Sequence, residues 1–136
     1  MVEMQISYDG KLHCTATHGP SGSVMTTDAP KDNMGQGASF SPTDLVGTAL
    51  GTCMLTTMAI VAQRHNIELA GSTAKVVKEM VSTPTRRIGK LLVEITVQTP
   101  LTEEQQTRLR EAALHCPVHR SLHPDVQLPV TFKWGK

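Results

Sequence analysis

The stretch from Leu45 to Ala62 most constrains the fold, because it contains no charged side chain. The run approaches the length needed to span a bilayer, but its four threonines and two glycines make it only mildly apolar. A helix without charge around its whole circumference is also typical of a buried core helix. Gly47 and Gly51 are four positions apart, so one face of such a helix can approach another element closely. We therefore expect a fully buried central helix and no membrane span.

The start of this helix is marked by the short sequence Ser-Pro-Thr-Asp. Ser41 suits the N-cap position and Pro42 suits the first helical position. Asp44 then lies in the first turn, where a negative charge is stabilised by the helix dipole. The pattern predicts a helix that continues to about His65.

Alternating apolar and polar residues predict strands on both sides of this helix. Asp9-Gly10 indicates a hairpin turn between two short strands, and a third strand follows. Thr102 and Gln105 fit a capping box at the start of a second, amphipathic helix. We expect an α+β fold with antiparallel sheets in a single domain, residues 1–136, with strands over 2–17, 23–29, 67–82, 86–99 and 126–134.

The charge balance narrows the function classes. With 13 basic and 12 acidic residues, the chain has no basic surplus to attract nucleic acid, and its 3% aromatic content disfavours base stacking. The three cysteines are an odd number, and no secretory leader is evident at the N-terminus. We therefore expect a cytoplasmic protein with free or catalytic cysteines, and with neither nucleic acid nor a membrane as partner.

Cys116 stands directly before Pro117, with a histidine at position 115 and another at 119. Proline favours the first helical position, so Cys116 is expected to be an N-cap whose sulfur faces unpaired backbone N–H groups. Those groups and the helix dipole favour the thiolate, as would both histidines if they point inward. The alternative is a small buried residue that caps a turn, and the local sequence does not decide between the two.

Cys53 and Cys14 are less distinctive. Cys53 lies among methionines and leucines in the uncharged helix, which on its own is typical of a buried structural cysteine. Cys14 lies in a predicted strand with no charged neighbour. A metal site from Cys116, His119 and His115, with or without Cys53, is a weaker alternative, because no second paired ligand motif occurs. The signatures of serine hydrolases and of P-loop proteins are absent.

Taken together, the segment "SFSPTDLVGTALGTCM" and the later "CPV" resemble the OsmC/Ohr family of osmotically inducible and organic hydroperoxide resistance proteins. Eleven positions separate Pro42 from Cys53, and 63 separate Cys53 from Cys116. The order of expected elements is similar over nearly the whole chain.

The resemblance implies an intertwined homodimer that reduces organic hydroperoxides with thiols and needs no metal or organic cofactor. It assigns Cys53 as the peroxidatic cysteine and Cys116 as the resolving cysteine, which reverses the preference for Cys116 from local sequence. Asp44 is a candidate for orienting a group of the site or for supplying a negative charge to it. The expected reductant is a dithiol such as a lipoylated protein. Methionines and leucines of the central helix are expected to line the substrate pocket.

The sequence also departs from the family pattern. Thr43 follows the helix-start proline where the characterised peroxidases carry a glutamate, and no arginine precedes Arg64. Lys11, Lys31 and the pair at 86 and 87 are the available cations, and lysine lacks the planar fork of arginine. Two other functions therefore remain open: a redox sensor of the same fold, and a dimer that binds a small apolar ligand.

Overall fold

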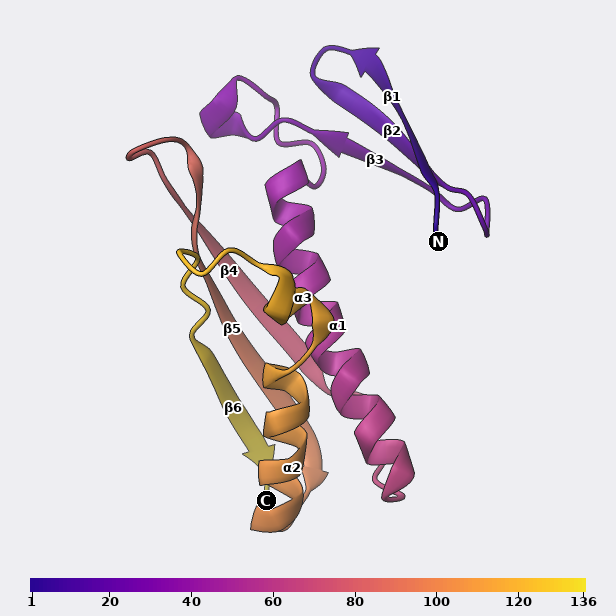
Figure 1. Cartoon of the computed structure of the whole chain (residues 1–136), viewed down its shortest axis with the longest axis vertical. Coiled ribbons are helices and arrows are strands. Elements are labelled where there is room, and N and C mark those ends of the chain that lie inside the picture. Colours follow the sequence, from indigo (N-terminus) through magenta and orange to yellow (C-terminus); the bar gives the residue numbers. More distant parts are fainter. The chain divides into compact units, whose positions relative to one another are not determined.

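The computed structural model describes residues 1–136 and has the α+β composition expected from the sequence. The chain forms two compact units, Met1–Val46 and Gly47–Lys136. Each unit contains one three-stranded sheet (Figure 1). The prediction of a single domain stays a prediction.

The first unit contains an antiparallel sheet of β1 (Met4–Gly10), β2 (His13–His18) and β3 (Val24–Asp28), in that order. The hairpin turn between β1 and β2 lies later than predicted. Lys11 and Leu12 form the turn, with φ of 54° and 66°, and Gly10 at φ 86° lies beside a shift in the strand register. The Asp-Gly pair thus ends the first strand and does not form the turn itself.

A buried aspartate organises the loop that follows β3. The Oδ2 atom of Asp28 accepts a hydrogen bond of 2.8 Å from the backbone N–H of Ala38, and its Oδ1 lies 3.5 Å from Nδ1 of His13. The loop includes a short 3-10 turn, η1 (Lys31–Asn33). The Asp28 carboxylate therefore holds together the segment that leads toward the first helix.

Helix α1 (Pro42–Arg64) ends within one residue of the predicted position. A Cβ atom added at Gly51 would lie 3.0 Å from Cγ2 of Val76, and one added at Gly47 would lie 3.4 Å from Cγ1 of the same valine. The glycines therefore let α1 lie close to the second sheet, as their spacing predicts. The residues buried along this stripe of α1 are Gly47, Leu50, Gly51, Met54, Met58 and Ala62.

The remainder of α1 differs from the expected fully buried helix. Between the buried positions lie exposed residues that include Thr48, Thr52, Thr56 and Ile60, and Ile60 retains 48% exposure. One sheet can cover only one stripe of a helix, so the second sheet does not bury the opposite face of α1. By length and apolar composition alone α1 would also be long enough to cross a membrane, a property shared by core helices of soluble proteins. Its close glycine packing agrees with the core-helix interpretation.

The second sheet contains β4 (Thr73–Val81), β5 (Arg87–Pro100) and β6 (Val130–Gly135), with β5 in the centre. The predicted alternation of β5 is confirmed, because every second side chain on one face is at most 2% exposed: Leu91, Val93, Ile95 and Val97. The β4–β5 pair is antiparallel, but β5 and β6 are parallel, whereas antiparallel sheets were expected. The last strand is also shorter than predicted and begins at Val130.

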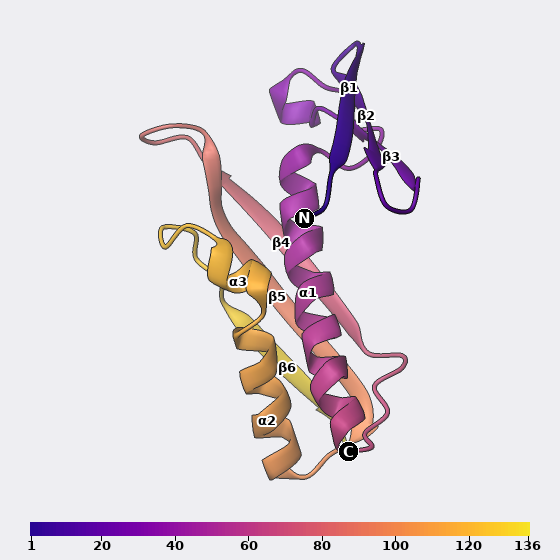
Figure 2. The same ribbon diagram turned by 45° about the vertical axis from the view of Figure 1, so that its right-hand side comes forward.

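Two helices connect β5 to β6. Helix α2 (Glu103–Leu114) begins with the predicted capping box of Thr102 and Gln105, and it is followed by the short α3 (Pro117–Ser121). In both views α1 and α2 lie on the same face of the sheet and run in opposite directions (Figures 1 and 2). A crossover of this kind allows the strands that it joins to be parallel.

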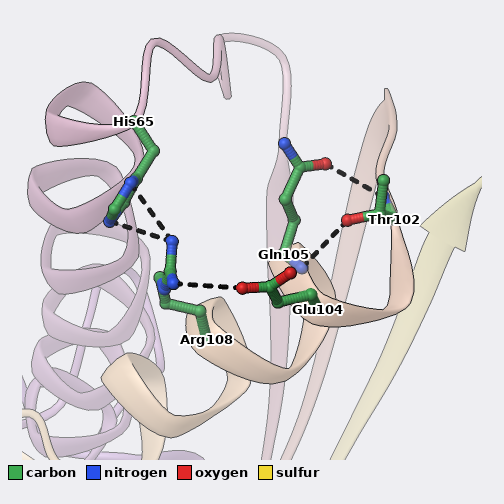
Figure 3. A network of polar contacts seen from close by, with 5 residues as sticks. All are labelled: His65, Thr102, Glu104, Gln105 and Arg108. Carbon is green, nitrogen blue, oxygen red and sulfur yellow. Dashed lines mark hydrogen bonds and ion pairs between the residues drawn. The ribbon is translucent and has the colours of Figure 1, made fainter.

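Side chains of α2 also contact its neighbours. Arg108 Nη1 lies 3.1 Å from Nδ1 of His65, just beyond the end of α1, and Arg108 Nη2 donates to Glu104 at 3.5 Å (Figure 3). Toward the sheet, the Arg110 guanidinium lies 5.3 Å from the ring centroid of Phe132, which stacks on Trp134. These contacts link α2 to α1 and to β6.

Candidate functional site

The site is built from two cysteines of the second unit. Cys53 lies in the middle of α1, where regular backbone hydrogen bonds and the packing of Gly51 fix its position. It is half-buried, next to the fully buried Met54. The sulfur of Cys53 therefore belongs to a long, well-packed element.

Cys116 is the N-cap of α3, as its position before Pro117 predicts. Its Sγ atom accepts a hydrogen bond of 3.3 Å from the backbone N–H of His119, and its backbone has φ −65° and ψ 147°. The residue is completely buried, with 0% exposure. Cys116 is thus both a helix cap and part of the core.

The fold brings these two cysteines together across the 63 positions that separate them. The Cys53 thiol lies near enough to Cys116 to raise the pKa of the Cys116 thiol. Both residues are free thiols in this structure. Two thiols this close can exchange between a dithiol and a disulfide when an oxidant converts one of them to a sulfenic acid.

The N–H groups at the start of α3 do lower the pKa of Cys116, as expected, but the net shift of this pKa is upward. Burial raises the pKa of the Cys116 thiol, and the nearby Cys53 raises this pKa further through its hydrogen bond and its charge. The backbone N–H groups of His119 and Val118 act in the opposite direction but do not outweigh burial. Cys116 is therefore a protonated thiol at neutral pH, which does not suit the role of first nucleophile.

The two flanking histidines were expected to favour the Cys116 thiolate if they pointed inward. They do not place a positive charge beside the Cys116 sulfur. Burial lowers the pKa of His119, and His115 and Arg120 lower this pKa further, so His119 is neutral at pH 7. The exposed His115 turns back along α2, where its Nδ1 pairs with the carbonyl oxygen of Glu111 at 2.7 Å. Neither ring supplies a cation to the sulfur of Cys116.

Asp44 lies in the first turn of α1, nine residues before Cys53. Its Oδ2 accepts a hydrogen bond of 2.9 Å from the backbone N–H of Ser41, and its own N–H donates to Oγ of Ser41 at 3.1 Å. The two residues cap each other, in agreement with the N-cap role predicted for Ser41. These two hydrogen bonds stabilise the start of α1.

The methionines of α1 do not line an open pocket. Met54 and Met58 are completely buried against the core, which differs from their expected place around a substrate. A separate cavity of about 430 Å³ lies at the C-terminal end of α1, between Leu55, Ala59 and the segment 67–72. Neither cysteine lines this cavity.

Other candidate residues lie elsewhere. Cys14 is in β2, opposite Tyr8 and Thr27, and belongs to the first unit. No group of three or more histidine, cysteine, aspartate or glutamate side chains comes together in a way that could hold a metal ion. Of the predicted cations, Arg87 donates to the carbonyl oxygen of Ile88 at 3.1 Å.

A sequence profile described as OsmC-like protein matches residues 35–131. A search of curated proteins found no match. The matched segment includes both cysteines of the site.

Solved structures with the same fold cover almost the whole chain. A candidate osmotic stress induced and detoxification response protein from Psychrobacter arcticus 273-4 is 41% identical, with a TM-score of 0.92, over 97% of this chain and 96% of that chain. An organic hydroperoxide resistance protein OsmC from Legionella pneumophila is 15% identical, with a TM-score of 0.79, over 98% and 96%. The organic hydroperoxide resistance protein OhrB of Bacillus subtilis is 18% identical, with a TM-score of 0.70, over 98% of both chains. The last two similarities concern the fold.

Proposed function

Because the chain belongs to the OsmC-like family, we propose that it is a thiol-dependent peroxidase that reduces organic hydroperoxides through Cys53 and Cys116. The observation that carries this proposal is the juxtaposition of two free thiols in unequal settings. Cys53 is partly exposed, whereas Cys116 is buried with a raised pKa. This asymmetry supports Cys53 as the peroxidatic cysteine, which attacks the peroxide, and Cys116 as the resolving cysteine.

The proposed cycle has three steps. The Cys53 thiolate attacks the terminal peroxide oxygen, the O–O bond breaks, and the alkoxide takes a proton and leaves as the alcohol. The Cys116 sulfur then attacks the sulfenic acid of Cys53, so that the S–S bond forms, the S–O bond breaks and water is released. An external dithiol reduces the disulfide by exchange and becomes a disulfide itself. No metal or organic cofactor takes part.

The proposal includes a homodimer in the cytoplasm. Between Leu45 and Ala62 the exposed residues of α1 are threonine, alanine and isoleucine, with no charge among them, which supports contact with a second copy of the chain. Asp44 orients the start of α1. The reductant is a dithiol, such as a lipoylated protein.

The proposal is tested by a peptide map of the reduced protein after one equivalent of cumene hydroperoxide, without reductant. We expect a Cys53–Cys116 disulfide within seconds and turnover when a dithiol is added. The Cys53→Ser variant should lose all peroxide consumption, whereas Cys116→Ser should react once and stop as a sulfenic acid. Cys14→Ser is the matched control and should behave as the natural chain does.

Unchanged thiols, or oxidation spread over all three cysteines, would contradict the peroxidase. Ligand binding that is indifferent to both cysteines would then favour the apolar-ligand dimer. A comparison with hydrogen peroxide tests the substrate class, because the proposal predicts faster reaction with the organic peroxide.

A redox sensor is the second candidate function. Thr43 in place of the glutamate of the characterised peroxidases, with no arginine before Arg64, favours it. A sensor would form the same disulfide but react slowly with every peroxide. The rate of the first step therefore distinguishes the sensor from the enzyme.

A further inference from the structure

Helix α3 is a small element that depends on the sulfur of Cys116. It has five residues and none of them is fully buried. At its start the Sγ of Cys116 accepts the N–H of His119 at 3.3 Å, and the carbonyl oxygen of Cys116 accepts the N–H of Arg120 at 3.1 Å. A helix this short is marginal without its cap and its tertiary contacts.

The same sulfur has a second use in the proposed reaction. A covalent bond holds two sulfurs closer together than a hydrogen bond does, so one of the two cysteines must shift when the disulfide forms. Cys53 lies in a 23-residue helix whose Gly51 leaves no room against Val76, so α1 does not readily move. The shift therefore falls on Cys116 and on the helix that it caps.

We propose that formation of the Cys53–Cys116 bond withdraws the sulfur cap from α3, so that Pro117–Ser121 loosens only in the oxidised protein. This inference rests on the proposed function for the bond itself. In the bond-forming step Cys116 loses its thiol proton, the sulfenic acid loses its oxygen as water, and the sulfur moves from the His119 N–H to Cys53. Reduction by a dithiol returns the proton and the cap.

The consequence concerns access to the disulfide. Cys116 is completely buried in the reduced protein, which shields its sulfur from reagents in solution. Loosening of α3 opens one side of the disulfide just when a dithiol must attack it. The capped helix protects the thiol, and its release admits the reductant.

Hydrogen–deuterium exchange of the complete protein, read by mass spectrometry on peptides that cover residues 115–122, tests the inference. The disulfide is made with one equivalent of diamide, which takes two hydrogens from two thiols, so that the test does not depend on peroxide chemistry. A non-reducing peptide map confirms which cysteines are joined. We expect exchange in α3 to become about fivefold faster on oxidation, as for the loss of a helix cap.

Three variants separate the cap from other effects of oxidation. Cys116→Ser keeps an oxygen cap and forms no bond, so α3 should stay protected before and after diamide. Cys116→Ala has no cap and should exchange fast in both conditions. Cys53→Ser keeps the sulfur cap and cannot form the bond, so diamide should leave α3 unchanged.

The outcomes are distinct. A Cys53–Cys116 bond without faster exchange in α3 would overturn the inference and leave the proposed function intact. A bond that forms with diamide but not with cumene hydroperoxide would overturn the peroxidase and leave the inference intact. Failure of the bond to form with either oxidant would overturn both.

Discussion

The two cysteines of the site have opposite structural settings. Cys53 lies in the middle of α1, which packs on β4 through Gly51 and Val76. Cys116 lies at the start of a five-residue helix, and its own sulfur forms part of that helix. One sulfur is attached to a rigid element, and the other stabilises a weak one.

This difference teaches that burial and rigidity are separate properties. Cys116 is the more buried of the two residues, yet the element around it is the smaller one. Burial raises the pKa of its thiol, while the short helix leaves its position adjustable. For the proposed disulfide, this difference leaves one fixed and one adjustable sulfur.

The largest expected effect comes from filling the contact between α1 and β4. Gly51→Leu should lower the free energy of unfolding by about 3 kcal/mol, because even a Cβ atom would lie 3.0 Å from Val76. The change should also slow disulfide formation, since α1 is displaced. Urea denaturation measures the stability. Thr107→Leu, which adds the same side chain at an exposed position of α2, should change it by less than about 0.5 kcal/mol.

The second prediction concerns the pH dependence of the step carried out by Cys116. Its raised pKa means that the thiolate increases about tenfold for each pH unit across the neutral range. Decay of the Cys53 sulfenic acid, followed by rapid mixing with a dimedone quench, should therefore accelerate from pH 6 upward. The acceleration should continue above the pH that equals the ordinary pKa of a cysteine thiol. A rate that is already constant at neutral pH would contradict the assignment of Cys116 as the buried partner.

A third change removes the oxygen cap of α2, which is the counterpart of the sulfur cap of α3. Thr102→Ala removes an acceptor for the N–H of Gln105, at 3.2 Å, and should cost about 1 kcal/mol of stability. Thr107→Ala, at an exposed position in the same helix, is the control and should not lower the stability, because alanine is the better helix former. Equal effects in denaturation curves would show that the cap contributes nothing.

The smallest effect is expected where α2 meets the end of α1. Arg108→Ala removes contacts to His65 and Glu104 that are exposed to solvent (Figure 3), so it should cost only a few tenths of a kcal/mol. Arg110→Ala should cost more, about 0.5 to 1 kcal/mol, because Arg110 lies over the rings of Phe132 and Trp134. If denaturation at moderate salt showed a larger loss of stability for Arg108→Ala than for Arg110→Ala, this prediction would be contradicted.

Local signals predicted much of the fold. The Ser-Pro start of α1, the capping box at Thr102 and the alternation of β5 all depend on residues that are neighbours in sequence or in one element. The position of Cys116 as an N-cap follows from Pro117 in the same way. Such features need no knowledge of what packs against them.

The missed features depend on tertiary contacts. The raised pKa of Cys116 comes from burial and from Cys53, and neither can be read from the residues beside it. The parallel pairing of β5 and β6 depends on where the crossover places the last strand, because periodicity carries no direction. Similarly, the absence of charge from a helix does not tell which of its faces the chain itself buries, and α1 is buried along one stripe only.

The crossover between β5 and β6 has a further consequence, for the order of events during folding. Val93 pairs with Val130, so this part of the sheet cannot form until a long segment of chain has closed into a loop. Contacts between residues so distant in sequence form slowly. Cys116 belongs to the same late segment, so on the ribosome Cys53 is made 63 residues before Cys116. During that interval the nascent chain carries Cys14 and Cys53 but not Cys116, so under the proposed function a sulfenic acid formed on Cys53 lacks its resolving cysteine.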